Sequence, residues 1–352
     1  MKGKKVCFVP GWDCHGLPIE LKVLQALDKN QRAELTPIKL RKKAATYAKK
    51  QVSQQMEGFK RWGVWGDWAQ PYLTLDKRFE SSQVKLFGEM VFKGYIYRGL
   101  KPVHWSPSSQ TALAEAELEY PPRHVSKSIY VGFTVDQIPK KLTQKIHNQA
   151  PDLFNSEGKL KEVKLVIWTT TPWTIPANEA ISVNQKLEYV IAQSPDQSLI
   201  IIANDLLEEV SGNIGIDYKK RVLIKGSELD QIVYKHPLFD KKSPVVLGGD
   251  YITTESGTGL VHTAPGHGVD DFNTGKKYKL PISCPVDEKG FLTKEAGKFE
   301  GLNVLKDANH FIINELVETE SLLKEIPYEH RYPYDWRTKK PTIFRATEQW
   351  FA

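Results

Sequence analysis

Cysteine and long hydrophobic runs are both scarce in this sequence. Its 352 residues include only three cysteines, Cys7, Cys14 and Cys284, with no CxxC pair. This argues against a disulfide framework or a cysteine-rich zinc site and is typical of a reducing compartment. No apolar run approaches the roughly 20 residues that a membrane helix requires. The basic start, MKGKKVCFVPGWD, has too short an apolar stretch for a signal peptide. We therefore expect a soluble, unsecreted protein of the cytoplasm or of an organelle, without a membrane span.

Negative charge is in the minority. The 49 Lys and Arg residues outnumber the 42 Asp and Glu residues, for a formal net charge of +7. This surplus fits an anionic partner such as nucleic acid, and it fits a generic basic protein equally well. The contents of apolar and charged residues are ordinary for a globular protein. At about 150 residues per domain, the length predicts two domains.

The first 126 residues combine strand and helix patterns. We expect a buried strand from residue 8, a helix with Thr36 as N-cap and Pro37 at its first position, and a second helix from Phe79 to Lys93. Gly94 should end the second helix before a strand at Tyr95–Tyr97. Three tryptophans interleaved with glycines favour a buried aromatic corner over a base-stacking surface: Trp62, Trp65 and Trp68.

From Ser126 to about Tyr328 the sequence reads as many short strands separated by turn residues. The strand-like runs are SIYVGFTV, KLVIWTTT, EYVIAQ, LIIIAN, PVVLGGDYI and GTGLVHTA. They predict a compact β-rich domain, a barrel or sandwich with one or two helices. From His330 the sequence turns basic and aromatic, as if re-entering the first domain.

The stretch GWDCHGLPIE places Asp13 and His15 just after a strand end, between glycines. In open α/β sheets ligands bind beyond the carboxyl ends of strands. A carboxylate there can pair with an ammonium group, and an imidazole can donate or accept a hydrogen bond. In the alternative interpretation, Asp13 caps the following helix and His15 is structural.

The stretch WTTTPWTIPAN places three consecutive threonines at the end of an apolar strand. Successive side chains of a strand point to opposite faces, so the three hydroxyls cannot all point the same way. One or two of them should point into any site at the end of the strand. Such hydroxyls can hold a ribose or an ester carbonyl, or orient a water molecule. Taken alone, the triplet is explained as well by β-propensity and a proline-rich exit loop.

Residues 260–272, LVHTAPGHGVDDF, combine two histidines and two aspartates. The spacing of His262 and His267 matches neither a helical HExxH motif nor a zinc knuckle, and two acids do not suit a phosphate loop. Asp270 and Asp271 stand at the start of a predicted helix whose other end carries lysines, the order that the helix dipole favours. Capping explains one aspartate, but not both together with two histidines.

Taken together, these stretches resemble the isoleucyl-tRNA synthetases, class I enzymes, of the bacterial or organellar type. The motifs occur in that family's order over essentially the whole chain: GWDCHGLPIE, GVWGDWAQPYLT, TALAEAELEY, WTTTPWTIPAN, GTGLVHTAPGHGVDDF and FRATEQWF. Within the first motif, CHGLP points to the isoleucyl branch and not to its valyl or leucyl relatives.

The resemblance implies an α/β fold in which an incomplete Rossmann-type class I synthetase catalytic domain is interrupted by an inserted β-barrel editing domain. Residues 1–126 would belong to the catalytic domain with its connective-peptide stem. Residues 127–328 would form the insert, and residues 329–352 would return to the catalytic domain.

The resemblance also implies two sites. In the synthetic site Asp13 would bind the ammonium group of the amino acid, beside Gly11 and His15. In the editing pocket Asp271 would hold the ammonium group of a misattached amino acid, with His262 alongside. The opposite wall, which would place the terminal ribose and the attacking water, would comprise Thr169, Thr170, Thr171 and Asn178.

The implied function is that of a portion of a ligase that attaches isoleucine to tRNA(Ile) and edits valyl-tRNA(Ile) or valyl-adenylate by hydrolysis. A second pocket is needed because one methylene group provides only about 1–3 kcal/mol of discrimination, a range established on these synthetases themselves. The implied partners are tRNA(Ile), valine, isoleucine and their adenylates, with the protein as a monomer.

The sequence departs from the family in its ATP motifs and in its cysteines. No HxGH occurs, and KKSP at Lys241–Pro244 has the wrong context for a KMSKS-like loop. We expect this chain alone to bind no cofactor, ATP and Mg²⁺ serving the full-length synthetase, and to carry out at most editing. A freestanding trans-editing deacylase and a non-catalytic tRNA-binding remnant stay open as alternatives. Ser106, Ser109 and Thr338 replace cysteines found in many relatives, so we predict no zinc knuckle and no metal site.

Overall fold

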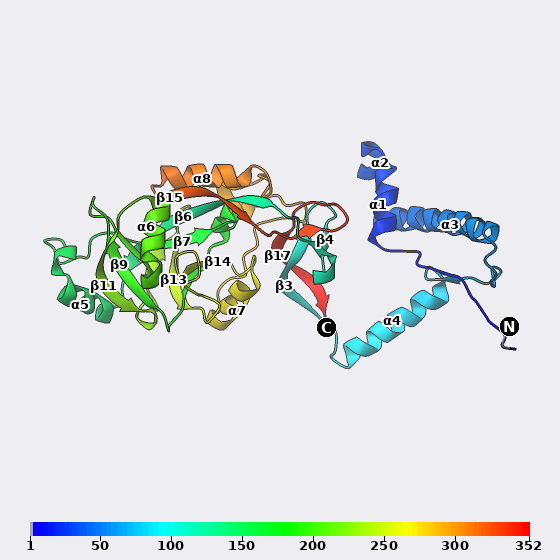
Figure 1. Cartoon of the computed structure of the whole chain (residues 1–352), viewed down its shortest axis with the longest axis horizontal. Helices are drawn as coiled ribbons and strands as arrows, with labels where there is room; N and C mark the ends of the chain where they lie inside the picture. Colours follow the sequence, from blue (N-terminus) through cyan, green and yellow to red (C-terminus); the bar gives the residue numbers. More distant parts are fainter. Residues whose placement is uncertain (1–2) are drawn as a thin grey trace. The chain divides into compact units, whose positions relative to one another are not determined.

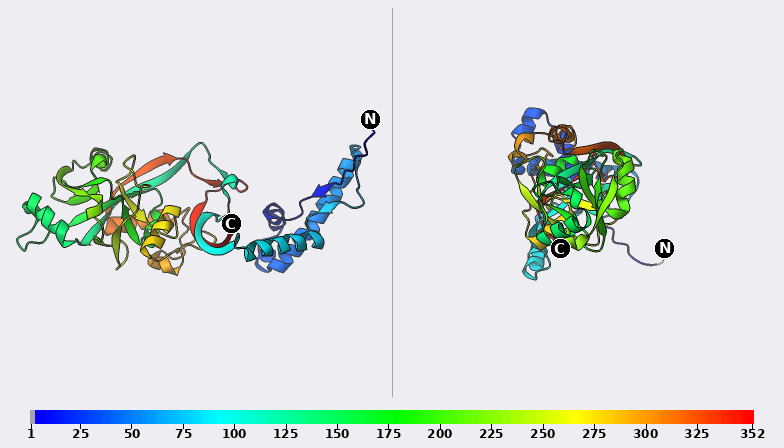
Figure 2. Two further views of the ribbon diagram at one scale, coloured as in Figure 1. Left: turned by 90° about the horizontal axis from the view of Figure 1, so that it is seen from below. Right: turned by 90° about the vertical axis from the view of Figure 1, so that its left-hand side faces the viewer.

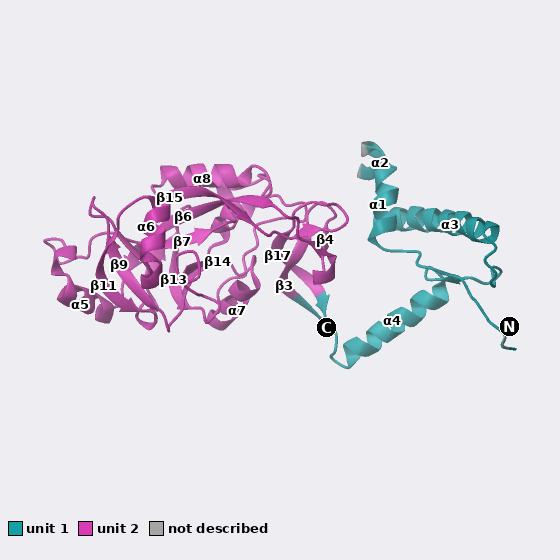
Figure 3. Ribbon diagram, viewed as in Figure 1, with its two compact units in different colours: residues 1–99, 350–352 teal, residues 100–349 magenta. Residues whose placement is uncertain are grey.

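The computed structural model describes residues 3–352, which form two compact units. Of the described residues, unit 1 comprises 3–99 and 350–352, and unit 2 comprises 100–349 (Figure 3). The longest helix has 25 residues and carries many charges, and in the described range no helix has the length and hydrophobicity needed to cross a bilayer.

Unit 1 is mostly helical. Its elements are β1 (Gly11–Trp12), α1 (Leu17–Gln25), α2 (Lys29–Ala33), α3 (Pro37–Arg61), β2 (Tyr72–Leu73) and α4 (Lys77–Phe92). The long helix α3 begins as predicted, because the Thr36 hydroxyl accepts a hydrogen bond from the Lys39 amide and Pro37 occupies the first turn. The buried core of unit 1 is small: Cys14, Ala48 and Val52.

The predicted buried strand from residue 8 is wrong. Only Gly11 and Trp12 form strand, pairing in parallel with β2, and Val6 and Phe8 are exposed. A strand needs paired backbone on successive residues, and among the described residues the strand pairing of this segment is limited to Gly11 with Tyr72 and Trp12 with Leu73. The Phe8 carbonyl accepts one further hydrogen bond, from the Asp67 amide at 2.9 Å, which does not extend the strand.

The predicted aromatic corner is wrong for two of its three tryptophans. Trp62 and Trp65 are 74% and 89% exposed, because the glycine-containing turn after α3 holds both rings away from the small core. Trp68 is half-buried and stacks on Phe59. The second helix and Gly94, which has φ of +76°, agree with expectation.

The strand expected at Tyr95–Tyr97 instead begins at Tyr97 and is longer. This strand, β3 (Tyr97–Ser106), lies between β17 (Ile343–Phe351) and β4 (Thr111–Ala112) in a three-stranded sheet. Its length follows from this pairing with distant residues, which the local sequence does not encode.

Unit 2 is built on a ten-stranded sheet with the order β11-β9-β10-β7-β6-β12-β13-β8-β14, and β15 also pairs with β6. The strands are β6 (His124–Gln137), β7 (Val163–Thr169), β8 (Ala180–Val183), β9 (Glu188–Gln193), β10 (Leu199–Ala203), β11 (Lys219–Lys225), β12 (Val233–Lys235), β13 (Lys242–Leu247), β14 (Leu260–Thr263) and β15 (Leu322–His330). A small separate pair joins β5 (Leu118–Glu119) to β16 (Tyr334–Asp335). All five residues of β10 are buried, as expected for a strand covered on both faces.

Helices surround this sheet. They are α5 (Lys140–Gln149), α6 (Leu207–Ile214), α7 (Val269–Tyr278) and α8 (Ala308–Glu318), with 3₁₀ helices η1 (Glu115–Glu117), η2 (Pro151–Leu153), η3 (Pro172–Ala177), η4 (Asn204–Leu206), η5 (Gly226–Glu228) and η6 (Lys294–Phe299). Helix α8 lies along β15, and α5 lies at the periphery of unit 2 (Figures 1 and 2). The mixed α/β class is confirmed, and each of the six predicted runs contains strand residues. Four of the runs extend beyond their strand: KLVIWTTT leaves it after Thr169, LIIIAN after Ala203 and PVVLGGDYI after Leu247, and GTGLVHTA enters it only at Leu260 and leaves it after Thr263.

Candidate functional site

The threonine triplet joins the end of β7 to the 3₁₀ helix η3. Thr169 is the last residue of β7, and its hydroxyl lies 3.2 Å from that of Thr171 and accepts a hydrogen bond from the Thr171 amide. The Thr171 carbonyl in turn accepts from the Thr174 hydroxyl at 2.9 Å. Thr170 lies between them, half-buried like its neighbours. Short-range hydrogen bonds therefore fix the triplet to η3.

Asn178 holds its amide in one orientation inside the core. Its Nδ2 donates to the Ala180 carbonyl at 3.0 Å, and because a carbonyl only accepts, this bond identifies the nitrogen. The Tyr234 hydroxyl donates to Asn178 Oδ1 at 2.5 Å. Burial raises the pKa of Tyr234 well above its usual value, so that hydroxyl keeps its proton.

His262, on β14, is hydrogen-bonded through both ring nitrogens. Asn178 Nδ2 donates to His262 Nδ1 at 2.7 Å, so the ring proton resides on Nε2, which lies 3.0 Å from the Thr174 hydroxyl. The Thr174 proton goes to the Thr171 carbonyl, which leaves Thr174 Oγ1 free to accept. Burial, aided by His236 and His267, lowers the pKa of His262 to about 3. His262 is therefore neutral and fully engaged.

Asp271 lies half-buried in the first turn of α7. Its Oδ2 accepts a hydrogen bond from the Ala264 amide at 2.8 Å, whereas the N-cap of α7 is Gly268. Asp271 is therefore not a helix cap. Burial raises the pKa of Asp271 to about 7 against the opposing Ala264 bond, and Asp270 adds to the rise. In the part of the chain that the structure describes, Asp271 has no ion-pair partner.

The structure thus brings most of the predicted pocket residues into one connected group. His262 bonds directly to Asn178 and, through Thr174, to Thr171. Asp271 is hydrogen-bonded to the Ala264 amide, two residues after His262, but neither Asp271 nor Thr170 has a direct hydrogen bond to this group.

Two members of the group were not among the predicted residues. Thr174 has a local signal, because it follows Thr171 by three residues and such residues eclipse in a 3₁₀ turn. Tyr234, on β12, is brought in only by long-range sheet pairing and has no local signal.

The first motif lies in unit 1. Gly11 starts β1, Asp13 accepts a hydrogen bond from the Thr74 hydroxyl at 3.2 Å, and His15 Nδ1 lies 3.9 Å from Asp13 Oδ1. The N-cap of α1 is Gly16, so the interpretation of Asp13 as a cap is wrong. A cleft of about 600 Å³ beside His15 is lined by residues that include Arg41, Lys77 and Glu80.

Asp335 contacts residues at the three positions where we expected relatives to have cysteine. The hydroxyls of Ser106 and Ser109 donate to Asp335 Oδ2 at 2.7 and 2.6 Å, and the amides of Arg337 and Thr338 donate to Oδ1. The Thr338 hydroxyl pairs with Ser108 at 2.6 Å. Hydroxyls and one fully hydrogen-bonded carboxylate are not a zinc donor set, so these residues do not fit that metal.

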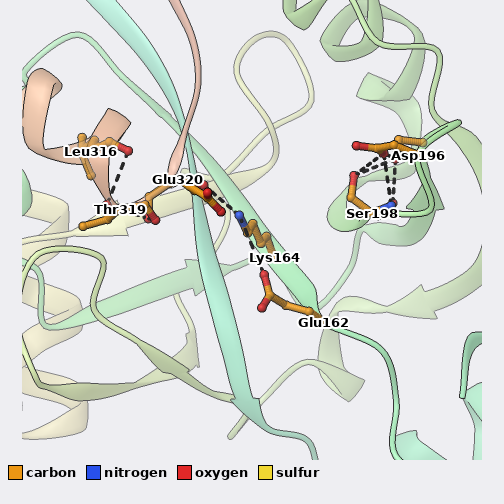
Figure 4. A network of polar contacts seen from close by, with 9 residues as sticks. Glu162, Lys164, Asp196, Ser198, Leu316, Thr319 and Glu320 are labelled. Atoms are coloured by element: carbon orange, nitrogen blue, oxygen red, sulfur yellow. Dashed lines mark hydrogen bonds and ion pairs between the residues drawn. The ribbon is translucent and has the colours of Figure 1, made fainter. Parts of the chain in front are cut away.

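A second polar network lies on the other end of β7. Lys164 Nζ donates to the Glu320 carbonyl at 2.8 Å and lies 3.9 Å from Glu162, while the Asp196 turn is closed by Ser198 (Figure 4). The Lys164 contacts tie the turn before β15 to β7.

Comparison with known proteins identifies the family. The model of the tRNA synthetases class I (I, L, M and V) matches residues 1–352. Relatives named isoleucine–tRNA ligase are 88% identical in Prochlorococcus marinus strain NATL2A, 65% in strain MIT 9211 of that organism and 62% in Parasynechococcus marenigrum strain WH8102. Each match covers 100% of this chain and 36% of the relative, so the chain spans about a third of their length.

Two solved structures are similar at low identity. They are the editing domains of cytosolic leucyl-tRNA synthetases from P. falciparum and P. knowlesi, each 13% identical, with TM-scores of 0.42 and 0.44. The matches cover 58% and 63% of this chain and 99% of each domain. With the family model matched over all 352 residues and relatives named for isoleucine, the resemblance found in the motifs is confirmed, and the chain belongs to the class I tRNA synthetases (I, L, M and V).

Proposed function

We propose that this chain is part of an isoleucine–tRNA ligase and that unit 2 removes valine from valyl-tRNA(Ile) or valyl-adenylate by hydrolysis. The observation that carries the proposal is the setting of Asp271, a half-buried carboxylate with no ion-pair partner among the described residues, held by the amide of Ala264, two residues after His262. The name shared by the relatives supports the assignment.

In this proposal Asp271 binds the ammonium group of the misattached amino acid. Burial raises the pKa of the Asp271 carboxyl, which has no positively charged partner within the described part of the chain. The ammonium group of a bound substrate would pair with the carboxylate and favour its ionised form. The resulting charge-assisted hydrogen bond holds the aminoacyl group by its α-ammonium group, which every attached amino acid carries. A pocket that admits valine but excludes the additional methylene of isoleucine makes hydrolysis selective.

The hydroxyls of Thr169, Thr170 and Thr171 place the ribose and the attacking water. His262 is not the general base in this scheme, because both of its nitrogens are engaged and burial keeps it neutral. It acts instead by fixing Thr174, and so the triplet, while Asn178 fixes His262. Rate enhancement then comes from orienting water against a positioned carbonyl.

For the whole protein we propose attachment of isoleucine to tRNA(Ile), with ATP and Mg²⁺ as the cofactors. Gly11, Asp13 and His15 would bind the amino acid through its ammonium group. The exposure of the Asp13 carboxylate, at 81%, and the cleft beside His15 support this role. A monomeric protein in the cytoplasm or an organelle completes the proposal.

The test is release of valine from valyl-tRNA(Ile) by the purified chain, with isoleucyl-tRNA(Ile) as the competing substrate. Asp271→Ala should lower the rate about a hundredfold, the scale expected for loss of a positioning contact. The matched control is Asp270→Ala, in the same helical turn but exposed, which should retain activity within about threefold. Equal losses in both variants, or no release by a folded chain, would contradict the proposal.

A further inference from the structure

Strand β17 holds the loop of residues 264–268, which connects β14 to α7. The Ala346 amide donates to the Gly266 carbonyl at 2.7 Å, and His267 Nδ1 lies 2.9 Å from the Phe344 carbonyl. Both contacts link the loop to a strand about 80 positions further along the sequence. They fall on Gly266 and His267, two of the four residues between Ala264 and the start of α7. Ala264 bonds to Asp271, and α7 carries Asp271.

The hydrogen bond to Phe344 determines the tautomer of His267. A carbonyl oxygen only accepts, so the proton resides on Nδ1 and Nε2 carries a lone pair. Burial lowers the pKa of His267 to about 4, which keeps the ring neutral. The ring also packs edge-on against Trp173 of η3, with centroids 5.0 Å apart. His267 therefore touches both the supporting strand and the 3₁₀ helix that follows the threonine triplet.

The loop has little room to move on its other side. A Cβ atom at Gly266 would overlap the carbonyl of Ser283, so the backbone here is in direct contact with the neighbouring segment. At the same time the Gly266 carbonyl accepts from Ala346. The loop is thus held between residue 283 and β17. Because the loop connects Ala264, which bonds to Asp271, with the helix that carries Asp271, fixing the loop also fixes the Asp271 side chain.

We propose that His267 is a positioning residue for the hydrolytic pocket, which it fixes by donating from Nδ1 to the Phe344 carbonyl of β17. This inference rests on the proposed editing function and adds a residue to it. Because β17 lies in residues 343–351, outside the predicted insert of residues 127–328, the pocket depends on the segment that follows the insert. His267 acts through Asp271 and Trp173, and it does not exchange protons with the substrate.

Amide substitutions separate the two nitrogens of His267. The asparagine side chain places its NH₂ near the position of Nδ1, whereas the glutamine side chain reaches the position of Nε2. We expect His267→Ala and His267→Gln to lower kcat for valyl-tRNA(Ile) deacylation about tenfold to a hundredfold, with little change in KM. His267→Asn should restore kcat to within about threefold of the unsubstituted chain. His147→Ala, on the exposed face of α5, is the matched control.

Hydrogen exchange gives a readout that is independent of catalysis. Amides in residues 260–272 and 343–349 should exchange faster in His267→Ala and His267→Gln than in His267→Asn. Rescue by glutamine instead of asparagine, or equal exchange in all variants, would overturn the positioning role. If the unsubstituted chain releases no valine, the proposed function fails, and the exchange comparison still decides whether His267 anchors the loop.

Discussion

The carboxyl group of Asp271 lies where the folded protein favours its protonated form. Burial raises its pKa from 3.8 to about 7, so the folded chain binds this proton more tightly than the unfolded chain does. The contribution of this group to stability is therefore fully present below about pH 4 and is lost as the pH rises through about 7. An ammonium ligand would reverse that loss by pairing with the ionised form.

We predict that Asp271→Asn stabilises the chain at alkaline pH while lowering the deacylation rate about a hundredfold, as expected for Asp271→Ala. The asparagine oxygen can still accept from Ala264, but it carries no charge to desolvate. At pH 8 the free energy of unfolding should rise by roughly 2 kcal/mol, since each pKa unit corresponds to about 1.4 kcal/mol and partial exposure reduces the full value. At about pH 3.5, below the unfolded pKa, the two proteins should be nearly equal. Urea unfolding at both pH values measures this, and a less stable variant at pH 8 would contradict it.

Asp335 behaves in the opposite way. Burial alone would raise its pKa, but the hydrogen bonds from Ser109, Ser106 and the backbone of Arg337 and Thr338 outweigh burial and hold the pKa below its usual value. The stability that it contributes is therefore present above the unfolded pKa of about 4 and is lost as the pH falls through the folded pKa.

We predict that Asp335→Ala lowers the free energy of unfolding by about 2–4 kcal/mol at pH 7, because the buried Ser106 hydroxyl and the half-buried Ser109 hydroxyl lose their acceptor. The difference from the unsubstituted chain should narrow toward pH 3. Asp250→Ala, which removes an exposed ion pair with Lys186, is the control and should cost less than about 1 kcal/mol. Thermal unfolding across this pH range tests both, and a loss independent of pH would refute the assignment to a carboxylate.

At the level of elements, the entry into β14 depends on one glycine. Gly259 has φ of +74°, and a Cβ atom there would overlap the side chain of Ala203 on β10. We expect Gly259→Ala to destabilise the chain by about 2 kcal/mol or more, through both backbone strain and overlap. Gly212→Ala, in α6 with open space around it, should stabilise by about 0.5–1 kcal/mol. Denaturant midpoints give both values, and equal effects would contradict the argument.

Strands of unit 2 were predictable wherever apolar runs and turn residues alternate. The run LIIIAN predicts β10 because a fully buried strand is a continuous apolar segment. The pattern fails at β11, KKRVLIK. Most of its exposed positions carry lysines, so the sequence lacks the longer apolar run that predicts a strand elsewhere in unit 2. The pattern fails also for residues 6–10. Their apolar sequence is typical of a strand, but no neighbouring strand pairs with them among the described residues.

The residues of the candidate site were predicted from their chemical types and from the family motifs. The residues to which they form hydrogen bonds were not predicted. Nothing in the sequence indicates that Asn178 bonds to Tyr234 or that His267 bonds to the backbone of residue 344. These contacts depend on strand order, which brings together residues more than 50 positions apart. The roles of the predicted site residues and the domain boundaries stay predictions.

For the molecule as a whole, the two units differ greatly in the size of their cores. Three buried side chains form the core cluster of unit 1, whereas that of unit 2 extends over most strands of its sheet. We predict that amides in α3 exchange with solvent at least about tenfold faster than those in β6 and β7, because opening costs little where few apolar groups are buried. Hydrogen exchange read by mass spectrometry tests this, and equal protection would show that α3 has support beyond its own unit.

The pairing of β6 with β15 has a consequence for how such a protein can change over time. His124 and His330 are opposite each other in the register, so the chain leaves and returns one strand spacing apart, about 5 Å. The segment between these two residues, more than 200 residues long, can therefore be gained, lost or exchanged while the flanking strands β5 and β16 stay paired with each other. Replacing the segment by a short turn would leave the flanking chain ends already adjacent, so its removal should not require the rest of the chain to rearrange.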